Sequence, residues 1–458
     1  MRRSTLALLA LVSVTPAPLF AQGPSLEARY RPAADRLIDA ALADSAAWNK
    51  LARLTDSFGP RLSGSANLER AIDWILAEMR REGLDSVRGE PVMVPHWVRG
   101  EESAVMTAPW RKRLGMLGLG MSVGTPPGGI EAEVLVVSSF EELEQRKADA
   151  RGRIVVYDAP FTTYGETVRY RSSGASAAAR HGAVAVLVRS VASQSLYTPH
   201  TGTMTYDSVA PRIPAAAITV EDAMLLHRLQ RAGKPPRVRL VMGAETRPDA
   251  PSRNVVAEIR GSERPEEVVV LGGHIDSWDV GQGAMDDGAG CVVAWEAVRL
   301  IRALGLTPRR TIRVVLWTNE ENGLRGGTAY RDAHRDAVDR HVLAIESDNG
   351  VFTPSGFAFT GSDSARARVT EIARLLERIN ATSVSTGGGG ADIGPLMQLG
   401  VPGMNPEVDG SRYFWYHHSD ADTIDKLDPR DMGLVTAALA VMAYVVADLP
   451  EPLPRSGR

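Results

Sequence analysis

Apolar residues in the second half of the chain form short β-rich runs that alternate with longer segments of helical spacing. The predicted strands cover residues 268–272, 311–318, 342–346 and 356–360. The predicted helices between them cover residues 288–304, 326–337 and 364–379. Alternation at this spacing is typical of a mostly parallel central sheet with helices on both faces. We therefore predict an α/β fold, which ends in an apolar helix over residues 431–446.

Before residue 250, the pattern of apolar and polar residues differs between two parts of the chain. Residues 23–50 and 67–82 have helical spacing, and valines over residues 87–105 predict a pair of strands. Residues 115–245 instead contain short strands and small-residue helices, which indicates a smaller α/β module inserted into the larger domain. Within this module, residues 197–207 are predicted to form an exposed loop. The predicted domains are residues 22–114 and 246–458 for the larger, catalytic domain and 115–245 for the insert.

The first residues, MRRSTLALLALVSVTPAPLFAQG, have the pattern of a secretory signal. Arg2 and Arg3 precede an apolar run over residues 6–14, and Ala21 is a small residue suited to cleavage. The alternative, an uncleaved anchor, is less favoured because the run is shorter than the roughly 20 residues that a membrane span needs. No later stretch is expected to be long and apolar enough to cross a bilayer. We predict signal cleavage after residue 21 and an exported protein, periplasmic or secreted, with no membrane attachment.

The composition of the chain argues against several classes of function. The chain of 458 residues is 44% apolar and 23% charged, as ordinary globular proteins are. Its formal net charge of −3 becomes −5 without Arg2 and Arg3, so nothing indicates a nucleic-acid partner. Cys291 is the only cysteine, which excludes an intrachain disulfide. It falls in an apolar predicted helix, where a buried thiol is a better interpretation than a catalytic nucleophile.

Ligand-type side chains follow the predicted strands at the points where these strands end. The loop over residues 271–290 is the richest in such side chains. The candidates in this loop and in later ones are His274, Asp276, Asp286, Asp287, Glu320, Glu321, Glu346, Asp348, His417 and His418. Any one of them alone is more often a surface residue or a helix cap. Together, histidines and carboxylates at successive strand ends suit two borderline divalent ions such as Zn²⁺.

Five motifs resemble those of the M28 family of dizinc metallopeptidases, which includes zinc aminopeptidases and carboxypeptidases. They are GGHIDSWD, GAMDDGAG, WTNEENGLRGG, IESDNG and HHSDADT, and the resemblance runs over residues 254–427. FGPRLSGS, near the start of the chain, adds weaker support. Within the family the motifs are most similar to those of the carboxypeptidase branch. The inserted segment resembles the protease-associated domain that several members contain.

The resemblance implies a role for each motif residue. The implied metal ligands are His274, Asp286, Glu321, Asp348 and His418. Asp286 would bridge two Zn²⁺ ions, with His274 and Asp348 on one ion and Glu321 and His418 on the other. Glu320 would be the general base, and the Asp276 carboxylate would orient His274. The choice of one residue from each adjacent Asp, Glu and His pair rests on the motif alignment.

Two further assignments are left with an alternative. His417 stands where some relatives carry a tyrosine that stabilises the oxyanion, and a packed imidazole is an equally good interpretation. The glycine run STGGGGADIGP over residues 385–395 resembles a segment that lines the substrate pocket, whereas a plain linker is the alternative. Gly390 and Asp392 are the substrate-binding candidates in this run. Asp392 would bind a free amino terminus.

The function that the resemblance implies is an exported dizinc exopeptidase that acts on small peptides, above all dipeptides with free termini. Metal-activated water would attack the peptide carbonyl while Glu320 accepts a proton. A homodimer is also implied. The first alternative is a dizinc aminopeptidase of the same family. A single-zinc glutaminyl cyclase and a non-catalytic binding module are less favoured, because this chain retains every expected ligand position and the base.

Overall fold

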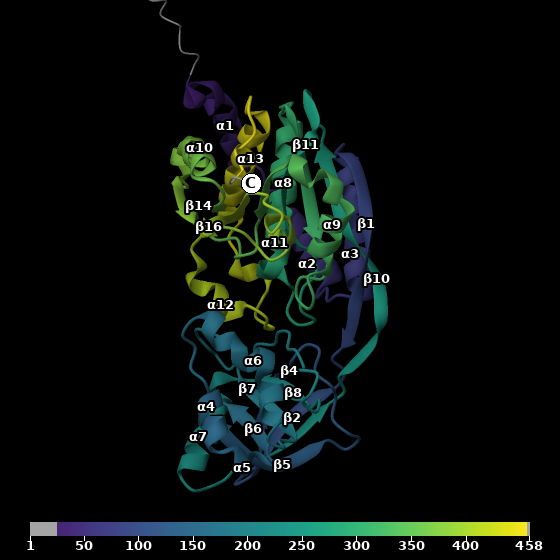
Figure 1. Ribbon diagram of the computed structural model, residues 1–458, viewed down its shortest axis with the longest axis vertical. Helices are drawn as coiled ribbons and strands as arrows, with labels where there is room; N and C mark the ends of the chain where they lie inside the picture. Colours follow the sequence, from purple (N-terminus) through teal and green to yellow (C-terminus); the bar gives the residue numbers. More distant parts are fainter. Residues whose placement is uncertain (1–24, 456–458) are drawn as a thin grey trace, which may run out of the picture.

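Two eight-stranded sheets form the framework of the protein, one in each of two α/β domains (Figure 1). The computed structural model describes residues 25–455. The predicted signal, residues 1–21, lies outside the described residues and stays a prediction. The sheet of the larger domain carries the predicted metal ligands, and the second sheet belongs to the insert.

The first sheet has the strand order β1-β10-β12-β11-β13-β16-β14-β15. The bounds are β1 Asp85–Val98, β10 Glu245–Ile259, β11 Arg264–His274, β12 Arg310–Trp317, β13 His341–Glu346, β14 Pro354–Thr360, β15 Ser383–Thr386 and β16 Gly403–Val408. The central strands β12, β11, β13 and β16 are parallel, which confirms the predicted centre of the sheet. Toward the edges, β1 pairs antiparallel with β10, β10 with β12 and β14 with β16, while β15 is parallel to β14, so the sheet as a whole is mixed.

Helices cover both faces of this sheet. The helices on one face are α1 Leu26–Ala43, α2 Ala46–Phe58, α3 Ala66–Arg81, α8 Ala289–Ala303, α10 Asp363–Ala373 and α13 Pro429–Asp448. The other face is covered by α9 Arg325–Ala333 and α11 Gly394–Met397. Successive strand residues point to opposite faces, so Val269 and Leu271 enter the larger core and Val268 and Val270 the smaller one. The helices α9 and α10 end earlier than predicted, and 3₁₀ turns follow them.

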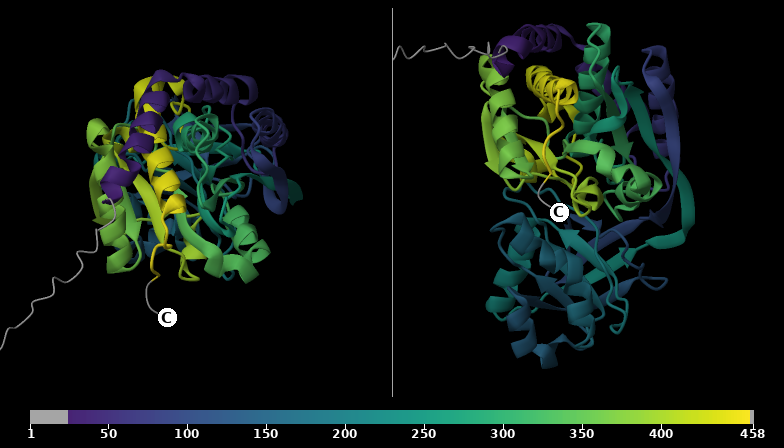
Figure 2. Two further views of the ribbon diagram at one scale, coloured as in Figure 1. Left: turned by 90° about the horizontal axis from the view of Figure 1, so that it is seen from above. Right: turned by 45° about the horizontal axis from the view of Figure 1, so that its top comes forward.

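Helix α13 departs from one sequence expectation. It has 20 residues and a mean hydropathy of 1.5, so by length and composition it could cross a membrane. The expectation that no stretch beyond the signal has this character is therefore wrong. In the structure 83% of the apolar window is buried against the rest of the protein. Figure 2 shows α13 beside α1, and it also packs against α8 and the sheet, which identifies it as a core helix.

The insert is built on the second sheet, of order β3-β2-β9-β5-β6-β7-β8-β4. Its strands are β2 Glu102–Ala108, β3 Lys112–Leu114, β4 Met116–Gly118, β5 Ile130–Val137, β6 Ile154–Tyr157, β7 Ala185–Arg189, β8 Ala215–Ile218 and β9 Arg237–Met242. Helices α4 Phe140–Gln145, α5 Lys147–Ala150 and α6 Tyr164–Ala179 pack on one face. Helix α7 Val220–Arg231 packs on the other. The second sheet includes β2 and β3, which precede the predicted domain boundary at residue 115.

Strands β1 and β10 connect the two domains. They pair with each other from Asp85 and Glu258 to Val98 and Glu245, and Figure 1 shows them running along one side toward the insert. The two strands predicted within residues 87–105 form, as β1 and β2, but they do not pair with each other, because β1 pairs with β10 and β2 pairs with β3 and β9. A run of valines indicates that strands form, but it does not indicate their partners.

The segment over residues 197–207 also differs from its prediction as an exposed loop. Tyr197 is exposed, but His200, Thr201 and Met204 are buried. The Thr201 backbone N–H donates a hydrogen bond of 2.8 Å to the carbonyl of His418 in the larger domain. The middle of the loop is buried, and its hydrogen bond joins it to the larger domain, a contact between segments that no local pattern could reveal.

Arg61, in the FGPRLSGS motif, holds the loop that follows β11. Its guanidinium is fully buried and donates to the carbonyls of Ile275, Gly59, Gln282 and Gly283 at 2.8–3.0 Å. One side chain therefore satisfies the carbonyls of Gly59, Ile275 and Gln282, and it adds a second donor to the Gly283 carbonyl, which also accepts from the N–H of Gly288. Three of these carbonyls, those of Ile275, Gln282 and Gly283, belong to the loop that carries the candidate metal ligand Asp286.

We expect Arg61→Met to lower the free energy of unfolding by about 3 kcal/mol or more, because it leaves several buried carbonyls unpaired. The measurement is urea denaturation followed by circular dichroism. Arg53→Met is the matched control, because the Arg53 side chain is 57% exposed and its one ion pair lies at the surface. Equal stability of the two variants would contradict this role of Arg61.

Candidate metal centre

The candidate ligands meet because three neighbouring parallel strands end at one edge of the first sheet. Strand β11 lies between β12 and β13, and its last residue is His274. Glu321 follows the end of β12, and Asp348 follows the end of β13. The carboxyl edge of a parallel sheet is where α/β folds place their sites. His418 reaches the same place from the loop after the short helix α12, Tyr413–Tyr416.

Backbone hydrogen bonds separate the roles of the adjacent residues Asp286 and Asp287. The two Asp287 oxygens accept from the backbone N–H groups of His274 (2.9 Å) and Gly290 (3.2 Å). Asp287 thus fastens the loop to β11 and α8. Asp422 accepts from the N–H of Asp286 (3.2 Å) and from those of the two residues before it (2.7 and 3.1 Å). These contacts leave the Asp286 carboxylate directed at the histidines.

Two groups of ligand atoms lie on either side of Asp286. In the first, His274 Nε2 is 3.2 Å from Asp286 Oδ1 and 3.4 Å from Asp348 Oδ1. In the second, His418 Nε2 is 3.3 Å from Asp286 Oδ2 and 3.0 Å from Glu321 Oε2. The two oxygens of Asp286 therefore face different groups.

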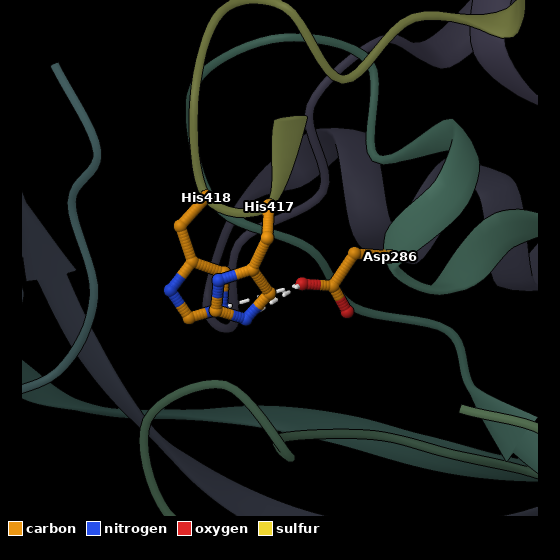
Figure 3. A group of neighbouring side chains, drawn as sticks. All are labelled: Asp286, His417 and His418. Atoms are coloured by element: carbon orange, nitrogen blue, oxygen red, sulfur yellow. Dashed lines mark ion pairs between the residues drawn. The ribbon is translucent and has the colours of Figure 1, made fainter. Parts of the chain in front are cut away.

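His417 approaches the same carboxylate as His418 (Figure 3). Its Nε2 is 3.5 Å from Asp286 Oδ2, and its ring stacks on that of His418 with centroids 3.5 Å apart. Distance to Asp286 alone therefore does not distinguish the two histidines. The Glu321 carboxylate distinguishes His418 from His417, because it contacts His418. Burial and the neighbouring His418 lower the pKa of His417 well below its usual range, which makes it a neutral imidazole.

These residues fit a divalent ion. Ligand atoms that share a tetrahedral zinc ion at about 2.0–2.1 Å lie roughly 3.3 Å apart, which matches the spacings in both groups. Glu321 Oε1 is buried and has no hydrogen-bond partner among the described residues. Burial raises the pKa of Glu321 to about 7, and the charge of Asp286 acts in the same direction. A cation relieves this crowding of negative charge.

The pKa of His418 also indicates that this group of residues fits a cation. Burial alone acts to lower its pKa, but Glu321 and Asp286 raise that pKa to about 10. The carboxylates thus bind a positive charge strongly at this imidazole. Imidazole and carboxylate ligands together are the donors that zinc takes in catalytic sites.

Asp276 is placed differently from the sequence expectation. His274 Nδ1 lies 3.0 Å from the backbone carbonyl of Asp276, whereas its carboxylate Oδ1 is 3.9 Å away. The carbonyl therefore orients the imidazole, a partner that metal-bound histidines often have. The carboxylate instead accepts from the backbone N–H groups of Glu320 (3.0 Å) and Glu321 (3.3 Å) and from the hydroxyl of Ser63 (3.3 Å). It fixes the turn that carries both glutamates.

A cavity of about 540 Å³ opens beside these ligands, between the two domains. Glu320, which is half-buried, lines it together with Asp348. Burial raises the pKa of Glu320 well above its usual range. The charge of His274 acts to lower this pKa, whereas the charges of Asp348 and Glu321 raise it further. A carboxyl group with a raised pKa at the edge of a cavity is suited to accept and return a proton.

The insert contributes part of the cavity wall, which the sequence did not reveal. Tyr164 and Arg171 of α6 line the cavity. The Tyr164 ring stacks on that of Phe414, with centroids 5.0 Å apart, and meets His417 edge-on at 5.3 Å. The pattern of α6 indicated a helix packed through small residues, and neither Tyr164 nor Arg171 belongs to a recognisable motif.

The substrate candidates in the glycine run lie elsewhere. Asp392 is 1% exposed and does not line the cavity, and burial together with Glu346 raises its pKa well above the usual range. Gly390 packs against Glu346, where a Cβ atom would come within 2.3 Å of that carboxyl carbon. Asp392 is therefore buried and Gly390 is half-buried, and neither residue lines the cavity. This position does not fit a residue that binds the amino terminus of a substrate in the cavity.

Comparison with known proteins gives consistent matches. The model of peptidase family M28 matches residues 254–443. Carboxypeptidase Q of Mus musculus is 52% identical over 89% of this chain and 87% of its own length. The enzyme of the same name from Homo sapiens is 51% identical over 90% of this chain and 88% of its length.

Solved structures show the same fold. A peptidase M28 precursor from Shewanella amazonensis superposes with a TM-score of 0.91 and 35% identity, over 95% of this chain and all of that one. An aminopeptidase from Aneurinibacillus sp. strain AM-1 has a TM-score of 0.66 at 20% identity, over 93% of this chain and 98% of its own, which shows the fold alone. With half of its residues shared with curated relatives over most of its length, the chain belongs to peptidase family M28, and it is a metallopeptidase.

Proposed function

We propose that this metallopeptidase is a dizinc exopeptidase that hydrolyses small peptides, above all dipeptides with free termini. The observation that carries the proposal is Asp286, whose two oxygens face two separate histidine–carboxylate pairs. A carboxylate in this position suits a bridge between two ions about 3.5–4 Å apart. Half of the sequence is shared with enzymes named carboxypeptidase Q, which favours carboxypeptidase or dipeptidase action over the alternative, a dizinc aminopeptidase.

The chain would hold its ions with residues on both sides of Asp286. His274 and Asp348 would hold one ion, and Glu321 and His418 the other. When bound, zinc ions supply Lewis acidity, which lowers the pKa of water and polarises a peptide carbonyl. The carbonyl of Asp276 would keep the His274 ring in the required tautomer and orientation.

Glu320 would carry the proton. It accepts a proton from water as the water oxygen bonds to the peptide carbonyl carbon, and it returns a proton to the leaving amine as the C–N bond breaks. Its position beside the cavity and its raised pKa both suit this exchange. The hydrogen bond from its backbone N–H to Asp276 holds the turn in place. His417, as a neutral imidazole, would donate a hydrogen bond to the developing oxyanion.

Export, assembly and partners complete the proposal. The first 21 residues have the pattern of a cleaved secretory signal, which supports a periplasmic or secreted protein without membrane attachment. The family resemblance implies a homodimer, and the net charge of −3 gives no support to nucleic-acid binding. The inserted domain is proposed to be of the protease-associated type.

We expect Glu320→Gln to retain its zinc and to lower kcat on Ala-Ala by about 10²–10⁴-fold, the usual contribution of a general base. Steady-state kinetics and elemental analysis measure the two quantities on the same preparation. Glu371→Gln, an equal change at a side chain 37% exposed on α10, is the control and should keep full activity. Normal turnover by the Glu320 variant would exclude this residue as the base.

We expect two zinc ions per chain in the wild-type protein and less than one in Asp286→Asn after the same chelator dialysis. The amide of asparagine can offer one oxygen only, so it cannot serve both groups. Inductively coupled plasma mass spectrometry gives the stoichiometry. Asp363→Asn, whose side chain is 95% exposed, is the matched control. One zinc ion in the wild type would favour the single-zinc glutaminyl cyclase alternative.

A further inference from the structure

The two domains meet at the backbone of the paired histidines. The Nδ1 atom of His200 lies 2.6 Å from the carbonyl oxygen of His417, and the N–H of Thr201 donates a hydrogen bond of 2.8 Å to the carbonyl of His418. Two consecutive residues of the insert therefore pair two consecutive carbonyls of the larger domain. The N–H of His417, by contrast, donates within the larger domain, to the carbonyl of Tyr413 (3.1 Å). The carbonyls beside the metal centre are thus held from outside the domain to which they belong.

His418 has a backbone conformation that its surroundings must fix. Its φ is 60°, in the left-handed region, which a residue with a Cβ atom adopts only at a cost in free energy. In this conformation its Nε2 lies 3.0 Å from Glu321 Oε2. A left-handed residue other than glycine persists where neighbouring contacts hold it. The hydrogen bonds from His200 and Thr201 are contacts of this kind, because they act on the peptide groups on both sides of the His418 Cα atom.

The histidines of the two candidate metal sites differ in how their rings are supported. His274 has the arrangement that is usual for a metal ligand, since its Nδ1 contacts the carbonyl of Asp276 at 3.0 Å. Among the described residues, the hydrogen-bonding neighbour of His418 Nδ1 is Nη1 of Arg171, at 3.4 Å. A guanidinium has no acceptor, so it cannot take the proton that Nδ1 carries when Nε2 binds a metal. The orientation of His418 therefore depends on its backbone and on the stacked ring of His417.

The side chain of His200 makes a single polar contact. The residue is 2% exposed, and burial lowers its pKa to about 4, so the ring is neutral and carries one N–H. A carbonyl only accepts, which places this N–H on Nδ1, facing His417. The other ring nitrogen, Nε2, is buried and has no hydrogen-bond partner among the described residues. The one hydrogen bond of this buried ring is therefore its bond to the larger domain.

The loop that carries His200 is fixed to the core of the insert. The N–H of His200 donates to the hydroxyl of Ser190 (2.9 Å), and this hydroxyl donates to the carbonyl of Ile218 at the end of β8 (2.7 Å). The hydroxyl of Thr201 donates to the carbonyl of Gly118 at the end of β4 (2.7 Å). Because both anchors are strand ends of the second sheet, the loop presents its two donors to the histidines in one position.

We propose that His200 is a positioning residue through which the insert sets the affinity of one metal site, the site formed by His418 and Glu321. The inference rests on the proposed dizinc centre and gives the insert a part in metal binding besides its place in the cavity wall. Without the bond from His200, the peptide group between His417 and His418 is no longer held, and the left-handed conformation relaxes. The His418 ring then leaves the direction in which it faces Glu321.

The site on the other side of Asp286 is supported from within the larger domain. The ring of His274 contacts the carbonyl of Asp276, and its N–H donates to the Asp287 carboxylate (2.9 Å). A change at His200 is therefore expected to weaken one ion and to spare the other. General destabilisation of the protein predicts a different result, in which both ions are weakened together.

The test measures the zinc affinity of both sites by chelator competition in His200→Phe, which keeps a ring and removes the donor. We expect the wild type to hold two ions and the variant to bind one of them about 10- to 100-fold more weakly, the usual effect of losing support around a ligand. Anomalous diffraction on crystals of the variant should show that the ion beside His274 remains. His200→Asn should recover most of the affinity, because its amide nitrogen takes the place of Nδ1. His227→Phe, at a histidine of α7 that contacts Asp158 within the insert, is the matched control.

Thermal denaturation of the metal-free proteins separates positioning from stability. We expect the melting temperature of His200→Phe to lie within about 4 °C of the wild-type value, since a single hydrogen bond is lost. Equal weakening of both ions would identify general destabilisation and overturn the assignment. Unchanged affinities, or loss of the ion beside His274 in place of the ion beside His418, would overturn it as well.

Hydrolysis of Ala-Ala, measured on the same preparations, separates this inference from the proposed function. If the fully loaded wild type does not cleave dipeptides, the proposed function fails, while selective loss of one zinc ion in His200→Phe still supports the positioning role. If the wild type cleaves dipeptides and His200→Phe binds both ions as tightly as the wild type, the positioning role is refuted and the proposed function stands.

Discussion

The position of one buried carboxylate, Asp286, is the constraint on which the site depends. It stands between two histidines, and the rest of the larger domain holds it there. Asp422 accepts hydrogen bonds from its backbone and from the preceding residues, and Arg61 pairs the carbonyls of the same loop. Several carboxylates without countercharge would be costly to bury together. The hydrogen bonds determine where the carboxylates lie, and their shared charge determines that cations are bound.

The site is divided between the two domains. The larger domain supplies the ligands at the carboxyl edge of its sheet, and the insert holds the loop of the paired histidines. His200 lies 2.6 Å from the carbonyl of His417, and Thr201 donates to that of His418. The paired strands β1 and β10 keep the insert in place for these contacts. The insert is therefore a wall of the cavity and a support for the ligands.

Regular patterns made much of the fold predictable. Alternating strands and helices after residue 254 indicated the parallel centre of the sheet, because period-two and helical spacing reflect burial directly. The motifs also indicated that His274, Asp286 and Glu321 belong to one site, and the structure brings them together. The partners of β1 and β2 could not be predicted, since pairing joins segments far apart in sequence. Asp276 shows a further limit, because its residue type indicated a carboxylate partner for His274 whereas its backbone carbonyl fills that place.

The central claim is that Asp286 lies between two metal ions. Anomalous diffraction at the zinc absorption edge, measured on crystals of the zinc-loaded protein, tests it most directly. We predict two peaks about 3.5–4 Å apart, one beside each oxygen of Asp286, with His274 on one side and His418 on the other. A single peak, or two peaks that do not have Asp286 between them, would contradict the account.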